Sequence, residues 1–338
     1  MVGDQISCAN MTTSNHMPAE RLLRKRRPEF IAVTPTSVAL FRLGEQCNND
    51  CPMCSNSGRK EAFFIKTPEL VNRADWLAEQ GFRRVVLTGG EPTIHPGFWD
   101  VVARLGERHV VWDINTHGRT FADTEFAERS RNEGLDRAIV SLHSQDIATS
   151  CLISGIKERA HHETVAGIRN LCHVGVDVMV NFVITKQNAA ELESFVDYCV
   201  TAFGAGIEIK FAFPSTSGKG GQWDGIQLQY HQVEEELRRA RERGRTLGIK
   251  IHAESVPPCV LGDPAAKNLS RSGFGETHYL EDITGRDVYS IRHIEASFTG
   301  YPAPCRSCSV LKTCPGISVA YLEHYGWEEF RPFDNDES

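Results

Sequence analysis

The chain has 338 residues, of which 41% are hydrophobic, and a formal net charge of −7. This composition supports a sizeable core, and the negative balance argues against general attraction to nucleic acid or anionic membranes. No stretch approaches the roughly 20 apolar residues that cross a bilayer, and no signal sequence opens the chain, so we expect a cytoplasmic protein without nucleic-acid or membrane partners.

The predicted elements alternate regularly after an irregular beginning. Residues 1–33 are polar and without period, and we expect a disordered tail there. Beyond it, apolar runs typical of buried strands alternate with helical patterns. Strands are predicted at 37–43, 83–90, 109–115, 137–143, 176–184 and 206–213, and helices at 67–81, 97–106, 121–133, 161–174, 189–203 and 229–247.

This alternation predicts an α/β fold with a parallel sheet covered by helices. Its units are too few for a closed eight-fold barrel, so a doubly wound sheet and an open partial barrel both fit the pattern. After residues 250–255 the rhythm stops and the sequence becomes rich in turns. We therefore divide the chain into a tail at 1–33, an α/β unit at 34–250 and a small region at 251–338.

A first cysteine group, CNNDCPMC, follows the first predicted strand with Cys47, Cys51 and Cys54. Cytoplasmic thiols stay reduced, so clustered cysteines indicate metal rather than disulfides. Three thiolates suit zinc or an iron–sulfur cluster. A closed zinc site needs a fourth ligand, which is not nearby, whereas a cluster with three protein ligands leaves one iron open to a substrate.

A second motif, TGGEP, occupies Thr88–Pro92 after the second predicted strand. Gly89 and Gly90 permit a ligand to approach the backbone closely, and their carbonyl oxygens can accept hydrogen bonds from an ammonium group. Alone, the stretch could be a tight turn between strand and helix. Its position one β/α unit after the cysteine loop favours a binding site.

With both motifs in this order, residues 36–215 resemble the radical S-adenosylmethionine (SAM) superfamily, within it the MoaA/PqqE-like group. The resemblance implies a partial (β/α)6 barrel with a small C-terminal iron–sulfur extension. It also implies that Cys47, Cys51 and Cys54 ligate a [4Fe-4S] cluster whose open iron binds SAM. Reductive cleavage of SAM, with electrons from a donor such as flavodoxin or ferredoxin, would yield a 5'-deoxyadenosyl radical that abstracts a substrate hydrogen.

The resemblance further implies SAM contacts at individual positions, although each polar residue among them could equally be ordinary loop or strand polarity. The implied SAM-binding residues are Met53, Gly89, Gly90, Glu91, Pro92, Thr116, Ser141 and Asn181. Met53 stands where the family usually has an aromatic residue near adenine, and His117 departs from the family's TNG-like strand end. No catalytic acid or base is assigned; His143 could serve, but a lone histidine at a strand end is more often only hydrogen-bonded.

A second cysteine group comprises Cys259 and a CxxCx5C run at Cys305, Cys308 and Cys314. Four cysteines permit a fully ligated site for zinc or for a second [4Fe-4S] cluster. The run resembles the SPASM and twitch extensions of radical SAM enzymes, and no further cysteine follows Cys314 as the longer SPASM pattern requires. The resemblance therefore implies one auxiliary cluster, with zinc as the structural alternative.

An auxiliary cluster able to accept an electron favours net oxidation, either dehydrogenation or cross-link formation. We therefore expect a radical SAM oxidoreductase or maturase, with a ribosomal peptide as its substrate. The first strand begins near residue 37, which leaves little room for the leader-binding domain common in such enzymes. A small metabolite is thus the alternative substrate, and a non-catalytic, metal-binding regulatory protein is the alternative of another class.

Overall fold

The computed structural model describes residues 33–34, 36–54, 63–215, 225–268, 276–280, 288–290 and 298–333. Nearly all of the tail expected at 1–33 lies outside these residues. Among the described helices, none is long and apolar enough to span a membrane.

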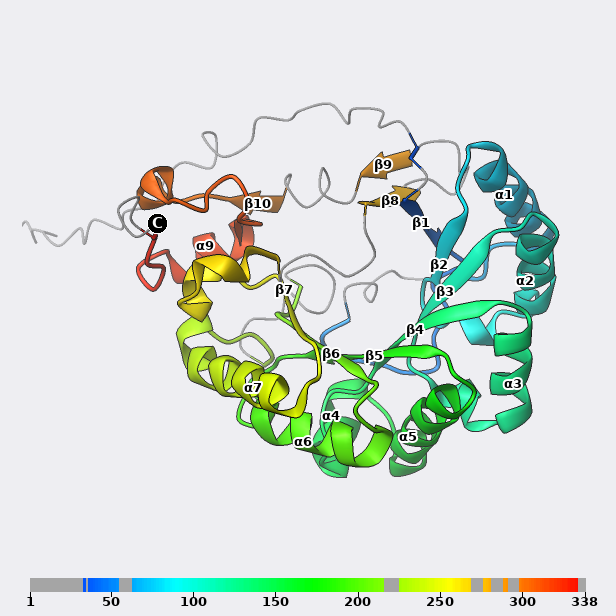
Figure 1. The fold of residues 1–338 in the computed structure, drawn as a ribbon, viewed down its shortest axis with the longest axis horizontal. Helices are drawn as coiled ribbons and strands as arrows, with labels where there is room; N and C mark the ends of the chain where they lie inside the picture. The colour runs from blue at the N-terminus through cyan, green and yellow to red at the C-terminus, as the bar shows by residue number, and fades with distance from the viewer. Residues whose placement is uncertain are drawn as a thin grey trace, which may run out of the picture.

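Seven parallel strands follow one another in chain order around a curved sheet, which forms an open half-barrel (Figure 1). The strands are β1 (Ser37–Arg42), β2 (Arg84–Thr88), β3 (Val111–Thr116), β4 (Leu135–Ser141), β5 (Asp177–Val183), β6 (Glu208–Ala212) and β7 (Ile251–Glu254). The predicted partial barrel is confirmed. β7 pairs in parallel with β6, so the sheet extends one strand beyond the predicted alternation.

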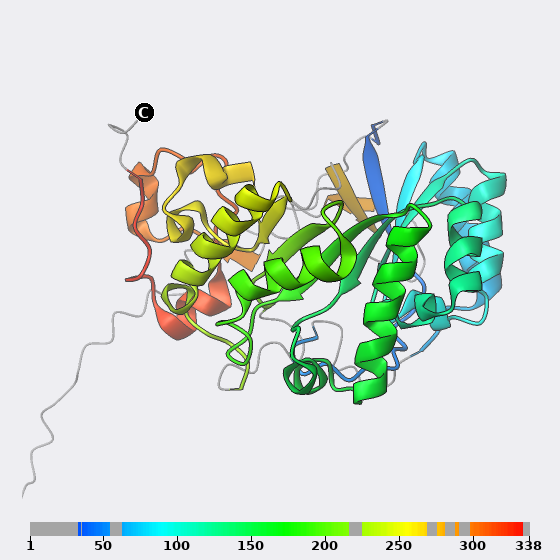
Figure 2. The same cartoon turned by 60° about the horizontal axis from the view of Figure 1, so that its bottom comes forward.

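Helices cover the convex face of this sheet (Figures 1 and 2). They include α1 (Thr67–Glu79), α2 (Phe98–Glu107), α3 (Thr124–Asn132), α5 (Glu158–His173), α6 (Leu192–Phe203) and α7 (Glu234–Leu247). Successive side chains of a strand point to opposite faces, and the helix-facing set, such as Val85 and Leu87 of β2, is fully buried. Leu70 and Leu77 of α1 pack into the same core. The hydrophobic core thus lies between the convex face of the sheet and the helices that cover it.

A short helix absent from the predictions, α4 (Ile147–Ser154), lies between β4 and α5. Asp146 caps its first turn by accepting a hydrogen bond from the backbone N–H of Thr149 at 2.8 Å. Gly155 ends it in the left-handed conformation, with φ of +59°. These caps fix a helix whose sequence has no marked apolar face.

The described strands and helices from residue 276 onward lie toward the two edges of the sheet. β8 (Glu276–Leu280) pairs in parallel with β1, and β9 (Val288–Ser290) pairs antiparallel with β8. The segment from β10 (Thr299–Gly300) to α9 (Val319–Tyr325) lies instead toward the β7 end of the sheet (Figure 1), where Tyr230 N donates to Tyr321 Oη of α9 at 3.1 Å. Since β7 belongs to the sheet, the domain boundary expected at residue 250 stays a prediction.

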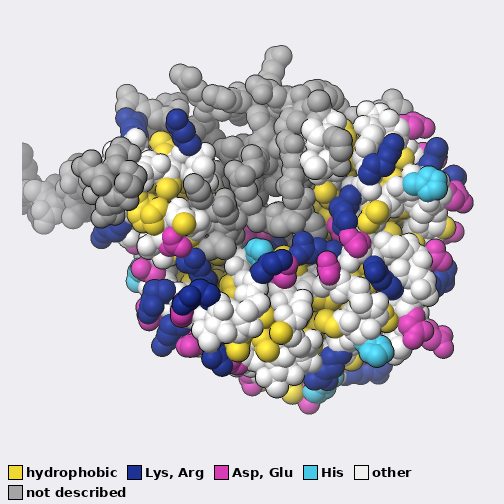
Figure 3. All heavy atoms as spheres, in the orientation of Figure 1, with side chains coloured by type: hydrophobic (Ala, Val, Ile, Leu, Met, Phe, Trp, Pro, Cys, Tyr) yellow, Lys and Arg dark blue, Asp and Glu magenta, His cyan; other side chains and the backbone are white. Residues whose placement is uncertain are grey.

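The concave face carries a charged network at the amino ends of the strands. Arg84 donates to Asp113 at 2.7 Å, and Arg137 donates to Glu208 at 2.6 Å. Lys250 also binds Glu208, at 2.9 Å. Positive and negative side chains intermingle across this part of the molecule in Figure 3. Pairing offsets the cost of burying these charges, of which Asp113 has no exposed surface.

Candidate active site

The first cysteine group lies in the loop that follows β1, with its three thiols partly buried. Burial raises the pKa of Cys47 and, together with the charges of Cys54 and Cys47, raises the pKa of Cys51 to about 12. Binding to iron would therefore have to release their protons.

No three His, Cys, Asp or Glu side chains in the described part of the chain converge closely enough to hold one metal ion. A mononuclear zinc site requires such convergence, because its bonds to sulfur measure about 2.3 Å. In an iron–sulfur cluster, each thiolate binds a different iron, so the sulfurs stay farther apart. That the cysteines bind a cluster stays a prediction.

The glycines of TGGEP pack directly against the backbone of the cysteine loop. Gly90 donates its N–H to the carbonyl oxygen of Gly44 at 3.0 Å, and Glu91 donates to that of Gln46 at 2.9 Å. A Cβ at Gly90 would lie 2.1 Å from Gln46 O, and one at Gly89 would lie 2.3 Å from Gly44 O. The close approach predicted for a ligand is thus made here by the chain's own backbone.

Glu91 and Thr116 join the ends of β2 and β3. The buried Glu91 carboxylate accepts hydrogen bonds from Thr93 Oγ1 at 2.7 Å, Thr116 Oγ1 at 2.8 Å and His117 N at 2.8 Å. Thr116 Oγ1 also accepts from Gly118 N at 2.9 Å. Both side chains, expected to contact SAM, therefore satisfy groups within the protein, and direct contact with SAM stays a prediction.

A cavity of about 670 Å³ opens at the carboxyl ends of β4 to β7. It brings Cys51 and Cys54 together with three of the expected SAM-binding residues, Met53, Ser141 and Asn181. The other expected SAM-binding residues, namely Gly89, Gly90, Glu91, Pro92 and Thr116, are not among those that line it. The structure therefore divides the expected site into residues that line the cavity and residues that support the cysteine loop.

Polar residues on three neighbouring strands form a row along the cavity wall. Ser141 of β4 is paired in register with Asn181 of β5, and Asn181 with Lys210 of β6. Within the described structure, the buried Oδ1 of Asn181 has no hydrogen-bond partner. A ligand that carries hydroxyl or amino donors would satisfy this atom, which fits the ribose or amino group of SAM.

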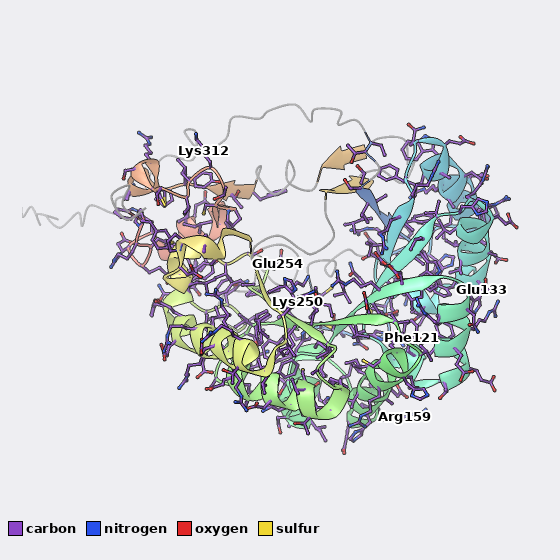
Figure 4. All side chains as sticks on the ribbon, viewed as in Figure 1. Phe121, Glu133, Arg159, Lys250, Glu254 and Lys312 are labelled. Atoms are coloured by element: carbon purple, nitrogen blue, oxygen red, sulfur yellow. The ribbon has the colours of Figure 1, made fainter. Side chains whose placement is uncertain are left out.

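Two residues of this wall, Lys210 and Glu254, were not singled out from the sequence. Lys210 Nζ donates to Glu254 Oε2 at 2.6 Å, and the Lys210 side chain is only 11% exposed. Figure 4 shows Glu254 on the inner side of the curved sheet. Alternation along β6 places Lys210 on the concave face between the core residues Ile209 and Phe211, and that alternation was the available signal.

His143 also lines the cavity, as a neutral imidazole. Its Nδ1 accepts a hydrogen bond from Val183 N at 3.1 Å, so the ring proton resides on Nε2. Complete burial lowers the pKa of His143 to about 4. His143 therefore offers the cavity a hydrogen-bond donor near neutral pH, in keeping with the hydrogen-bonded role favoured from the sequence, and no acid or base is assigned.

The second cysteine group surrounds a separate hollow. Cys259, Cys305, Cys308 and Cys314 line it together with apolar residues that include Val310, Leu311 and Ile317. Burial and the charges of the neighbouring thiols raise the pKa of Cys259 to about 12 and that of Cys305 to about 11. Gly316 lines both this hollow and the large cavity, so the two share a wall.

Comparison with known proteins matches residues 41–199 to the radical SAM superfamily. A PqqA peptide cyclase of Granulibacter bethesdensis is 26% identical over 304 residues, which cover 82% of this chain and 80% of that relative. A probable GTP 3',8-cyclase of Pyrococcus horikoshii is 30% identical over 153 residues, which cover 45% of this chain and 48% of that relative. In that case the chain matches about half of the relative's length.

Among solved structures, Streptococcus suis SuiB bound to its precursor peptide SuiA is similar to this chain. The similarity covers 90% of this chain and 75% of SuiB, with a TM-score of 0.61 and 16% sequence identity. At this identity the likeness supports the fold.

Proposed function

Residues 41–199 match the radical SAM superfamily, and from this match we propose that the chain is an enzyme that binds a [4Fe-4S] cluster through Cys47, Cys51 and Cys54. SAM would bind in the adjoining cavity. The observation that carries the proposal is the common lining of that cavity by Cys51, Cys54 and Asn181. When bound, the cluster and SAM supply the abstraction of a hydrogen atom from a substrate.

The chain's own residues would bind, orient and shield the reacting groups. Met53 is 7% exposed and packs with Ile153 and Ile226, so it offers SAM a soft apolar surface. Asn181 Oδ1 would accept a hydrogen bond, and His143 Nε2 would donate one. Walls contributed by the strands and by the C-terminal segment would limit the access of water to the reaction.

We propose a ribosomal peptide as the substrate. The proposal is supported by similarity to a PqqA peptide cyclase over most of both chains. The cavity also offers paired charges, Lys210 and Glu254, which could receive the carbonyl oxygen and the N–H of a main-chain amide. A small metabolite is the second candidate, favoured by similarity to a GTP 3',8-cyclase.

We further propose that Cys259, Cys305, Cys308 and Cys314 bind a second [4Fe-4S] cluster. Gly316 belongs to both the cysteine-lined hollow and the cavity, so a cluster held by these four cysteines would adjoin the cavity and could supply an electron acceptor beside it. An acceptor at that place would permit net oxidation of the substrate, by dehydrogenation or by cross-link formation. The first cluster would receive its electrons from a donor such as flavodoxin or ferredoxin.

Anaerobic reconstitution tests these assignments. Two clusters predict about eight irons per chain, whereas about four would contradict the second cluster. Dithionite and SAM should yield 5'-deoxyadenosine, and its absence from a fully loaded protein would favour a non-catalytic regulatory protein. Cys51→Ala should abolish this cleavage, whereas Cys308→Ala should preserve it and stop product formation. Equal behaviour of the two variants would contradict the division of roles.

The substrate class has its own test. The peptide encoded by a short reading frame beside this gene, if one exists, should change mass when incubated with the loaded enzyme, SAM and reductant. Biosynthetic genes in that place, together with an unmodified peptide, would favour the metabolite.

A further inference from the structure

The stretch between the first two cysteines is bound by side chains from the end of β3. His117 Nε2 lies 2.6 Å from Asn48 Oδ1. Arg119 Nη1 donates to Asn48 O at 3.2 Å and to Asn49 Oδ1 at 3.0 Å. The main chain of His117 takes part in the Glu91 network described above, but the contacts of the His117 ring and of Arg119 to residues 48 and 49 need a separate explanation.

The hydrogen bonds around the His117 ring fix its tautomer. Arg119 N donates to His117 Nδ1 at 3.2 Å, so Nδ1 carries no proton. The proton therefore resides on Nε2, which lies 2.6 Å from Asn48 Oδ1 and 3.4 Å from Glu91 Oε2, so Asn48 Oδ1 is the nearer acceptor. On the main chain, His117 N donates to Glu91 at 2.8 Å, and Thr164 Oγ1 donates to His117 O at 2.8 Å. With 7% of its surface exposed, the residue is held on every side.

Arg119 is held as firmly from the other direction. Its Nε donates to Glu163 Oε2 of α5 at 2.9 Å, and Arg159 donates to the second oxygen of the same carboxylate at 2.8 Å. The guanidinium is thus oriented before it reaches Asn48 and Asn49. Bonds from a charged donor are stronger than neutral ones, which favours a lasting contact to the loop.

The rest of the cysteine loop is held by close backbone packing instead. On the N-terminal side, Gly90 lies against the carbonyl oxygen of Gln46. On the C-terminal side, Gly155 lies so close to Asp50 that a Cβ would come within 2.1 Å of the Asp50 carbonyl oxygen. Residues 48 and 49, between these two supports, are reached by the side chains of His117 and Arg119, which follow β3.

We propose that His117 and Arg119 are positioning residues, which hold residues 48 and 49 so that Cys47 and Cys51 present their thiolates to the cluster together. The inference rests on the proposed function, since it takes the first cysteine group as the cluster site. It gives a role to the histidine that replaces asparagine in the TNG-like strand end. A shorter asparagine at 117 can accept the hydrogen bond from Arg119 N but does not place a donor at Asn48.

Four variants test the proposal in the reconstituted full-length protein. His117→Leu removes both ring hydrogen bonds. His117→Gln can place an amide N–H at the position of Nε2, whereas His117→Asn cannot. Asn48→Ala removes the acceptor of the same bond. His162→Leu, which changes an exposed histidine of α5, is the matched control.

The measurements are the rate of iron loss to a chelator and the change that SAM causes in the electron paramagnetic resonance spectrum of the reduced protein. Only a cluster with an open iron responds to SAM, so the spectrum separates the first cysteine group from the second. We expect His117→Leu, His117→Asn and Asn48→Ala to lose the SAM-responsive cluster about fivefold faster than wild type, the effect of one buried hydrogen bond. His117→Gln and His162→Leu should retain the wild-type rate.

Adding Asn48→Ala to His117→Leu should cause no further loss, because His117→Leu already removes the bond to Asn48. Thermal unfolding followed by circular dichroism identifies any variant that fails to fold. If His117→Leu fails to fold, the comparison of His117→Gln with His117→Asn still tests the proposal. Equal rates for His117→Gln and His117→Asn, or additive effects in the double variant, would overturn the proposal. A wild-type protein without a SAM-responsive cluster would overturn the proposed function and this inference together. If the wild type loads normally and His117→Leu loses iron at the wild-type rate, only the inference is overturned.

Discussion

Replacing Gly90 by alanine should displace the cysteine loop. The added Cβ would lie 2.1 Å from Gln46 O and 2.5 Å from Glu45 O. Both neighbours are backbone atoms, so no side-chain rotation relieves the clash. Relief requires the loop to move by about 1 Å, at a cost of about 1–3 kcal/mol. That movement would also weaken the hydrogen bonds that Gly44 and Gln46 accept, each worth about 1 kcal/mol.

We therefore expect Gly90→Ala to lower the free energy of unfolding by about 2–4 kcal/mol and to reduce the iron retained after reconstitution. Urea unfolding under anaerobic conditions measures the first quantity, and a colorimetric iron assay the second. Gly106→Ala, in α2, is the matched control, because nothing lies within 4 Å of its added Cβ. It should stabilise the protein by up to about 1 kcal/mol. Wild-type stability and iron content in Gly90→Ala would refute the packing argument.

Three further predictions concern buried polar groups. Glu91→Gln replaces one carboxylate oxygen with an amide N–H, which would face the donors that this oxygen now accepts from. The free energy of unfolding in urea should therefore fall by about 1–3 kcal/mol, and an unchanged value would count against the network. His143 binds a proton near pH 6.5 when unfolded but only near pH 4 when folded, so its stabilising contribution is complete above pH 6.5 and is lost between these values. His143→Asn keeps an acceptor for Val183 N without titrating, and its unfolding free energy should fall less, by up to about 3 kcal/mol, over this window; parallel pH profiles would contradict the assignment. Glu254→Gln should destabilise more than Lys210→Met, because the remaining lysine is 11% exposed and a remaining glutamate would be 36% exposed, and the reverse order in urea unfolding would exclude this explanation.

The repeating elements were predictable because each strand has one face in the core. Helix α1 begins at Thr67 as expected, and Gly81, with φ of +96°, ends it within the predicted range. β3 was predicted despite two polar residues, the buried Asp113 and the half-buried Asn115, because Trp112 and Ile114 alternate with them. Periodicity within a segment therefore identified the half-barrel. The pairing of β8 with β1 involves segments too distant in sequence for periodicity to reveal.

The glycines of TGGEP show where sequence reasoning stops. A pair of glycines predicts that no Cβ can be accommodated, but it does not identify the group that approaches. The structure places the cysteine loop there, at Gly44 and Gln46. Likewise, α4 lacks the apolar period that predicts a helix, and its only sequence signals were the caps Asp146 and Gly155. Both cases concern contacts between loops, which depend on three-dimensional arrangement more than on local pattern.

The linings of the two cysteine-bearing hollows differ in a way that bears on their proposed roles. Asn181, Lys210 and Glu254 give the large cavity unsatisfied or paired polar groups, which a ligand must meet with hydrogen bonds. The smaller hollow has proline and aliphatic side chains around its four cysteines, and they offer an incoming ligand little to bind. An electron needs no such groups, only a short path. A mainly apolar cavity that carries a few polar side chains therefore suits a substrate site, and the apolar surroundings of the four cysteines suit the proposed electron acceptor.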